Sequence, residues 1–239
     1  MWVAVYSSSS NFNYIELNKT LTYVVVITII NQIISKNTEM ELGIKVTSGS
    51  IAVDLIRPIG FFNYMFFNRI GNIVFNFVFS IIPLLVTAIF IFKISIVTDM
   101  LRILAFLVSV SLSFFIVYIF EFLIGLTSFW TTQIFGVSLL KSSLVNILAG
   151  LTVPLSFYPD ILQKVLLNLP FQAMYYIPVS IYLDLPYKSS LLQDFLMRIG
   201  LYNKTINLII EQSFWVVVVA AIAGLCWNIA KKKLVIQGG

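Results

Sequence analysis

Long apolar runs with almost no charge are the feature that most constrains this chain. Residues 103–126 and 206–230 are both long enough for a helix of about 20 residues, the length that crosses a bilayer core of about 30 Å. Only 10% of the residues are charged and 59% are hydrophobic, whereas about a quarter of a soluble domain is charged. Such a chain cannot cover a water-facing surface with polar groups, which predicts an integral membrane protein.

The apolar runs predict an all-α polytopic membrane protein with about five transmembrane helices. We expect a single domain over residues 1–239. Pro83 falls in the middle of the second predicted span and should kink it. The aromatic, amphipathic stretch before that span, up to Arg69 and Asn72, is expected to lie along the membrane interface. The predicted spans are residues 15–35, 73–92, 103–126, 134–153 and 206–230.

Residues 154–204 form the longest predicted non-spanning segment. It is apolar, yet prolines are expected to cut it into short pieces. Such pieces suit re-entrant or interfacial helices at the outer surface of the membrane. The prolines are Pro154, Pro159, Pro170, Pro178 and Pro186.

Basic residues predict the orientation of the chain. Lys231, Lys232 and Lys233 follow the last span, and loops rich in lysine and arginine favour the cytoplasmic side. Five spans then place residue 1 outside, and they place residues 36–72 and the C-terminus in the cytoplasm. Met1 to Tyr6 look like the end of a further span whose beginning is absent, as a start codon assigned too late or a shortened paralogue would produce.

Composition also excludes several kinds of site. The chain has no histidine and one cysteine, Cys226, which excludes an intramolecular disulfide and a conventional His/Cys zinc or haem site. No G-x-x-x-x-G-K-S/T pattern occurs, so no Walker-A loop can cradle ATP phosphates. The net charge of +5 is modest and no basic stripe with interleaved aromatics is present, which argues against nucleic-acid binding.

Residues 39–58 are the one place where charges of both signs crowd together between two apolar segments. Thr38 with Glu41 three residues later is a capping-box pattern that predicts the start of a short helix. Gly49 should break this helix, and Pro58 should stop the one that follows. Two interpretations stay open: an interfacial helix resting on lipid headgroups, or a cytoplasmic loop that takes up force from a partner that hydrolyses ATP.

Glu121 is the acid that lies well inside an apolar run. An ionisable group at that depth is a candidate intramembrane polar site; the alternative is a structural ion pair or a position near the headgroups. Asn31 and Gln32 interrupt the first span, and amides there need partners in neighbouring helices. A polar face surrounds Lys141 in the fourth span and comprises Ser138, Ser142, Ser143 and Asn146.

Several of these segments, in this order, resemble type-2 ATP-binding-cassette (ABC) exporter permeases. Residues 47–58, TSGSIAVDLIRP, are similar to the family's S-G-x-L/I-A-x-x-L-L/I-R-P segment. Residues 128–130, SFW, resemble its aromatic pair. Residues 148–178 resemble its progression of glycine, Pro-Leu, Tyr-Pro, Leu-Pro-Phe and proline, and the ending Gln-Gly-Gly resembles its terminus. The matches run from about residue 2 to residue 239.

The resemblance implies a half-transporter, in which two such permeases, identical or different, work with two separate ABC ATPase subunits. Residues 36–60 would be the cytoplasmic coupling loop that contacts the ATPase, and residues 154–178 the outer re-entrant hairpin. Family members usually have six spans. ATP and magnesium would bind the partner, so this chain would hold no cofactor or metal and would not be an enzyme. The coupling-loop residues would be Glu41, Gly49, Asp54, Arg57 and Pro58. Gly49 would break the helix and Pro58 would end it. Asp54 would form a surface ion pair, and the guanidinium of Arg57 would face a phosphate or carboxylate.

Three functions are therefore weighed. The first is an exporter permease of a bacterial-type plasma (inner) membrane, which moves an amphipathic drug, peptide, lipid or glycan with ATP hydrolysed by a partner. The second is an ATP-independent channel or scaffold subunit. The third is a membrane-embedded lipid-modifying enzyme, which would need clustered ionisable groups near a headgroup plane. The sequence scatters its acids and contains no histidine, which disfavours the third.

Overall fold

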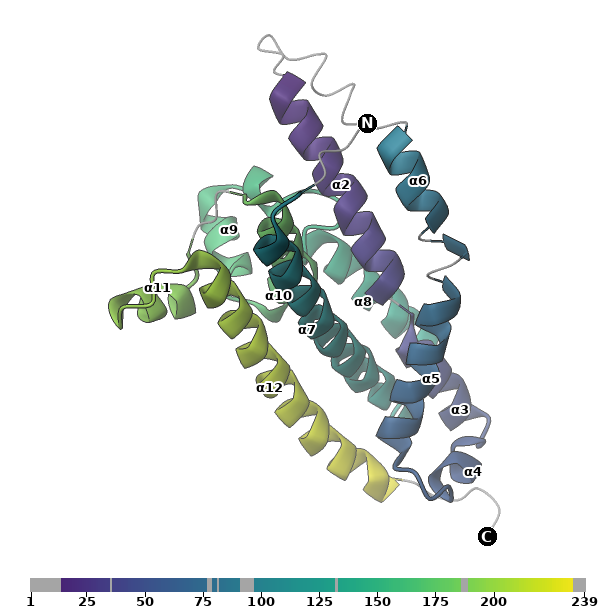
Figure 1. Ribbon diagram of the computed structural model, residues 1–239. Coiled ribbons are helices and arrows are strands. Elements are labelled where there is room, and N and C mark those ends of the chain that lie inside the picture. Colours follow the sequence, from purple (N-terminus) through teal and green to yellow (C-terminus); the bar gives the residue numbers. More distant parts are fainter. Residues whose placement is uncertain are drawn as a thin grey trace.

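The computed structural model describes residues 14–34, 36–76, 79–80, 82–90, 97–131, 133–185 and 189–233. The regular elements of these residues are all helical, which confirms the all-α prediction (Figure 1). Within the same residues, two helical segments, Met100–Phe129 and Lys204–Lys233, are long and apolar enough to cross a membrane. The total number of spans stays a prediction.

The long helix α7 (Met100–Gly125) is the centre of the bundle (Figure 1). Helices α12 (Lys204–Ala230), α10 (Pro170–Leu183), α3 (Thr38–Thr47) and α2 (Tyr14–Ile34) pack against it. Both long helices begin at a side-chain cap, because Asp99 accepts from the N–H of Leu101 and Asn203 accepts from the N–H of Ile206. These caps set the first residue of each long helix, and the apolar residues that follow favour a place in the bundle.

Helix α10 lies inside the bundle, and its residues from Gln172 to Ile181 are buried. Pro170 occupies its first turn, where the missing N–H costs nothing. Pro178, however, lies within α10, so the prediction that this proline cuts the segment is wrong. A proline inside a helix costs about 3 kcal/mol, and the burial of Ala173, Tyr176 and their neighbours offsets that cost.

The remaining pieces of residues 154–204 are short, as predicted for most of this region. They are η3 (Leu155–Phe157), α9 (Asp160–Leu166) and α11 (Leu191–Arg198). Their prolines also behave as expected, since Pro159 immediately precedes α9. Pro186 lies outside the described residues.

The second predicted span is divided between two helices, α5 (Phe61–Asn76) and α6 (Ile82–Phe90). Pro83 is the second residue of α6, a position in the first turn where proline is tolerated. Residues 77–78 and 81, between the two helices, lie outside the described residues, so the kink stays a prediction. Helix α5 continues through Asn72 without a break. The chain therefore does not break at the expected boundary between an interfacial stretch and a span, and the position of that boundary stays a prediction.

Helix α8 (Ile134–Leu148) ends before residue 153, the predicted limit of the fourth span. Gly150 follows it with a φ of 79°, a left-handed conformation that favours glycine. The Tyr23 hydroxyl donates to the carbonyl of Gly150 at 2.8 Å. A Cβ at Gly150 would lie 2.8 Å from the hydroxyl oxygen of Tyr23. The close approach of α2 to this turn therefore also requires glycine.

Candidate functional site

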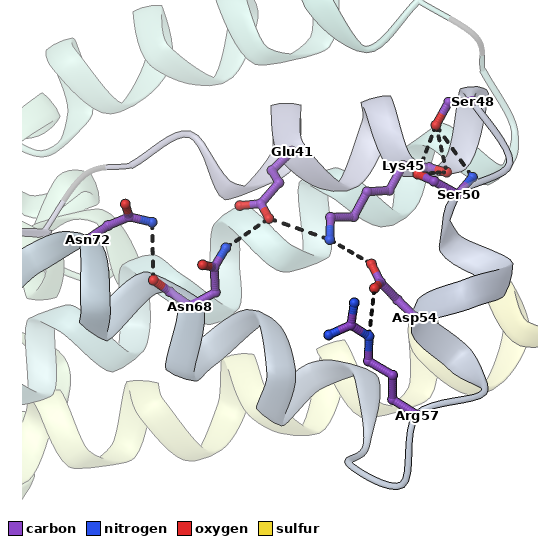
Figure 2. Close-up of polar contacts among 8 residues, drawn as sticks. All are labelled: Glu41, Lys45, Ser48, Ser50, Asp54, Arg57, Asn68 and Asn72. Atoms are coloured by element: carbon purple, nitrogen blue, oxygen red, sulfur yellow. Dashed lines mark hydrogen bonds and ion pairs between the residues drawn. The ribbon is translucent and has the colours of Figure 1, made fainter.

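The α3–α4 elbow, residues 38–58, comprises α3, the turn Ser48–Ser50, the five-residue helix α4 (Ile51–Leu55) and the residues up to Pro58. Gly49 has a φ of 74° and separates the two helices. The Ser48 and Ser50 hydroxyls lie 2.9 Å apart in this turn (Figure 2). Helix α4 ends before Pro58, so the glycine and the proline lie where the chain changes direction.

The charged side chains of the elbow form one chain of contacts centred on Asp54 (Figure 2). Its carboxylate lies 2.6 Å from Lys45 Nζ and 3.1 Å from Arg57 Nε. Glu41 extends the chain, 3.7 Å from Lys45 Nζ, and accepts from the Asn68 amide of α5 at 3.0 Å. Asp54 is 5% exposed, so it pairs within the elbow and not, as predicted, on the surface.

The environment of Lys45 favours its charged form. Burial by itself lowers the pKa of this lysine, but the hydrogen bond and negative charge of Asp54, with smaller contributions from Tyr64 and Glu41, outweigh burial and raise the pKa above its usual value. The Tyr64 ring of α5 also lies under both cations, 4.7 Å from Lys45 Nζ and 4.5 Å from Arg57 Cζ. The charges therefore hold the elbow in shape and fasten it to α5.

The outer surface of the elbow is apolar. Ile56 is 82% exposed and Val53 63%, and Ile44 is exposed as well, as is Ile59 directly after the elbow. In the ion pairs described above, by contrast, the central Asp54 is buried. The elbow therefore presents an apolar surface whose shape is set by charges beneath it.

A buried ion network, formed by Glu39, Arg69, Glu121 and Lys141, holds the other side of α3. Arg69 NH1 lies 2.6 Å from Glu121 Oε2, and Lys141 Nζ lies 2.7 Å from Glu39 Oε1. Lys141 also lies 3.6 Å from Glu121 Oε1, which joins the two pairs. All four residues are less than a tenth exposed. The network connects α3, α5, α7 and α8, helices far apart in the sequence.

Thr38 belongs to this network, which corrects the prediction of a capping box. Helix α3 does begin at Thr38, but the residue before it, Asn37, is the N-cap and makes no side-chain cap hydrogen bond. The Thr38 hydroxyl accepts from Arg69 at 2.6 Å, and its N–H donates to Glu121 at 3.1 Å. Charged partners from α5 and α7 thus take the place of the local Glu41 interaction. Arg69 also donates to the carbonyl of Ile34 at the end of α2.

Two glycines allow α3 to approach its neighbours closely. A Cβ on Gly43 would lie 2.6 Å from Ile134 of α8. A Cβ on Gly125 of α7 would lie 2.8 Å from Leu42 and 3.1 Å from the Cα of Glu39. The buried ion network therefore lies where α3 packs closely against α7 and α8.

A cavity of about 170 Å³ adjoins the network, where α2, α7, α8 and α10 meet. Glu121 and Lys141 line it, and Glu121 Oε1 has no hydrogen-bond partner among the described residues. Of the predicted polar face, Ser142 and Asn146 line the cavity, while Ser138 donates to Glu39 at 2.6 Å. The other lining residues are Asn31, Val117, Phe120, Val145, Leu151, Met174 and Tyr175.

The predicted site residues thus fall into two neighbouring places. Glu41, Asp54 and Arg57 form the surface elbow, whereas Glu121 is buried and paired, as its structural alternative required. Sequence reasoning missed Glu39 and Arg69 as members of this network, although the Arg69 side chain is only 3% exposed. The signal that pointed to such a partner was Glu121 itself, since a buried carboxylate needs a cation.

A second buried acid, Glu211 of α12, was also missed. It accepts from the Gln172 amide at 2.7 Å and from the Gln193 amide at 2.8 Å. These contacts tie α10 and α11 to α12, on the far side of the bundle from α4 (Figure 1). Within the described part of the chain, no group of three or more Asp, Glu, Cys or His side chains is placed to hold a metal ion.

Comparison with known proteins identifies the family. A family model described as ABC-2 family transporter protein matches residues 1–238. No curated protein and no solved structure matches the chain. The match covers nearly the whole sequence and agrees with the two apolar helices of membrane-spanning length. The chain belongs to the ABC-2 family of transporter proteins and is an integral membrane protein.

Proposed function

We propose that this chain is the permease subunit of an ABC exporter and that a separate ABC ATPase docks on the α3–α4 elbow. The observation that carries the proposal is the elbow itself, an apolar outer surface held in shape by Asp54 and its two cations. An exposed apolar surface rimmed by polar groups is typical of a protein–protein contact. Family membership supports an ABC ATPase as the partner, and it also supports a second permease, identical or different.

The position of the elbow agrees with a cytoplasmic partner. The elbow and the lysines of η4 (Lys231–Lys233) lie at the same end of the bundle (Figure 1). The Lys233 ammonium lies 5.4 Å from the Trp130 ring, and η2 (Leu126–Phe129), which precedes that tryptophan, packs against α3. Basic residues favour the cytoplasmic side. This end would therefore face the cytoplasm of a bacterial-type plasma membrane, with the C-terminus inside.

The buried ion network gives a route for force from the ATPase to the bundle. A push on the elbow would act on α3, and Glu39 and Thr38 of α3 are bonded to Lys141, Arg69 and Glu121. Because close contacts at Gly43 and Gly125 leave α3 no room to slide, α5, α7 and α8 would move with it. ATP binding and hydrolysis in the partner would thereby drive export of an amphipathic cargo.

Co-purification with a candidate ABC ATPase of the source genome tests the docking surface. We expect the ATPase to follow the tagged permease in stoichiometric amount, and Ile56→Ser to weaken this association. Ile161→Ser is the matched control, because Ile161 on α9 is 83% exposed, as much as Ile56 at 82%. Equal association of both variants, with a folded permease, would exclude the elbow as the docking site. Loss of ATPase from every form, the unaltered chain included, would contradict the exporter itself.

A further inference from the structure

We infer that the cavity beside the buried ion network binds an uncharged, hydroxyl-rich group of about the size of one sugar ring. As a site for cargo, this inference rests on the export function proposed above; as a binding site, it stands on the cavity alone. The cavity lies between α2, α7, α8 and α10, next to the residues that hold α3. A ligand there would touch the same side chains that fasten the elbow.

An unsatisfied acceptor belongs to a side chain that lines this ligand site. Glu121 is 1% exposed and lines the cavity, and its Oε1 atom has no hydrogen-bond partner among the described residues. The Lys141 ammonium forms a longer ion pair with this atom, with Nζ 3.6 Å away. Because an unpaired buried oxygen costs about 1–3 kcal/mol, a ligand that donates a hydrogen bond to Oε1 would remove that cost.

The charge balance of the network argues for a neutral ligand. Its carboxylates, Glu39 and Glu121, are matched by two cations, Arg69 and Lys141. A charged ligand would add an unmatched charge in a region of low dielectric, which is strongly unfavourable. An anion would also meet Glu121, and a cation would meet Lys141. A neutral hydrogen-bonding group avoids both penalties.

The rest of the lining suits hydroxyl groups. Asn31, Ser142 and Asn146 each carry groups that donate and accept hydrogen bonds, and a hydroxyl does both as well. Phe120 and Tyr175 add aromatic surface on which the carbon face of a sugar ring can pack. An engineered cavity of about 150 Å³ in another protein holds one benzene ring, so a volume of about 170 Å³ admits one six-membered ring.

Two sources carry this chemistry, the headgroup of a neutral glycolipid and a soluble sugar. The permease alone, in phosphatidylcholine nanodiscs, would be given monoglucosyldiacylglycerol or methyl glucoside. Diacylglycerol and phosphatidylglycerol are the comparison lipids, the first without a sugar and the second with an anionic headgroup. Native mass spectrometry measures the bound lipid, and the shift in Tm measures stabilisation by either probe. We expect a sugar-bearing probe to bind and to raise Tm, and neither comparison lipid to do so.

Neighbouring serines of α8 provide a matched pair of variants. Ser142 lines the cavity, whereas Ser143 is exposed and donates to the carbonyl of Leu139 within its own helix. Ser142→Leu should fill the cavity and weaken binding about tenfold or more, while Ser143→Leu should leave it unchanged. Asn31→Leu, on α2, tests the same cavity should Ser142→Leu fail to fold, which its Tm without ligand reveals.

The possible outcomes distinguish the two ligand sources, and they test the binding site separately from the export function. Binding of the glycolipid alone assigns the site to a lipid headgroup, and binding of methyl glucoside assigns it to a soluble sugar. Failure of both sugar probes, preference for phosphatidylglycerol, or equal binding by the Ser142 and Ser143 variants would overturn the inference. Because no ATPase takes part, a failed co-purification would contradict the proposed function without affecting this result.

Discussion

Two buried polar clusters hold α7 to its neighbours, one built from charges and one from uncharged groups. The buried ion network joins α7 to α3, α5 and α8 through Arg69, Glu121 and Lys141. The uncharged cluster joins α7 to α10 and α12. In it, the Ser109 hydroxyl donates to Gln212 at 2.6 Å, and the Gln212 amide donates to the Ser113 hydroxyl and to the Ala173 carbonyl, each at 3.0 Å.

The two clusters differ in what it costs to lose one partner. Uncharged hydrogen bonds contribute about 0.5–1.5 kcal/mol each and tolerate replacement of both partners. A buried ion pair contributes little net stability, but losing one partner leaves an uncompensated charge. The charged cluster therefore fixes α3 in one position more strictly than the uncharged cluster fixes α10 and α12. The predictions below test this contrast, from the largest expected effect to the smallest.

Removing one charge of the network should have the largest effect. Arg69→Met leaves Glu121 without its closest cation and should lower the free energy of unfolding by about 3–5 kcal/mol. Denaturant unfolding of the purified permease measures the loss. The double variant Arg69→Met/Glu121→Gln removes both charges and should be more stable than the single variant. A double variant that loses the sum of both single effects would show that the pair is not coupled.

A methyl group at the contact between α3 and α7 should have the next largest effect. In Gly125→Ala the new Cβ would lie 3.1 Å from the Cα of Glu39 and 2.8 Å from Leu42, and such overpacking costs about 1–3 kcal/mol. Gly224→Ala on α12 is the control, because nothing lies within 4 Å of its new Cβ, and its Tm should not fall. Equal Tm values for both variants would argue against a tight α3–α7 contact.

Breaking the uncharged cluster should cost less. Gln212→Leu leaves two serine hydroxyls without their amide, but a serine in a helix can turn to a carbonyl of its own helix, so we expect a loss of about 1–2 kcal/mol. The triple variant with Ser109→Ala and Ser113→Ala should recover much of that loss when unfolding is measured by the same denaturant titration. A Gln212→Leu loss as large as that of Arg69→Met would remove the distinction between the two clusters.

The exposed ion pair between Asp184 and Lys204, the first residue of α12, should have the smallest effect on stability. The hydrogen bond from Lys204 and its positive charge hold the pKa of Asp184 below its usual value of 3.8. A lowered carboxyl pKa means that the stabilisation is present above pH 3.8 and is lost as the pH falls below it. Surface pairs contribute under about 1 kcal/mol. The fall in Tm on acidification should therefore be slightly smaller for Asp184→Asn than for the unaltered chain, and an identical fall would show that the pair contributes nothing.

Prediction from the sequence succeeded where the signal is local. The all-α class follows from long apolar runs, and the break at Gly49 follows from a single residue. It failed where distant residues compete for the same groups. Thr38 has the spacing of a capping box, yet its hydroxyl and N–H are bonded to Arg69 and Glu121, which lie 31 and 83 residues away. Proline usually breaks a helix, yet Pro178 lies within α10, where burial of the neighbouring side chains offsets the cost of the proline.

The sequence by itself determined that this chain lies in a membrane, that it is helical, and that residues 39–58 form a charged segment unlike the rest. Composition and periodicity suffice for these properties, because each residue contributes to them independently of its distant partners. Only the tertiary structure decided that Arg69 pairs with Glu121, and that Lys141 and Glu39 complete the network. Each charge of this network is buried beside a counterion, and that counterion comes from another helix.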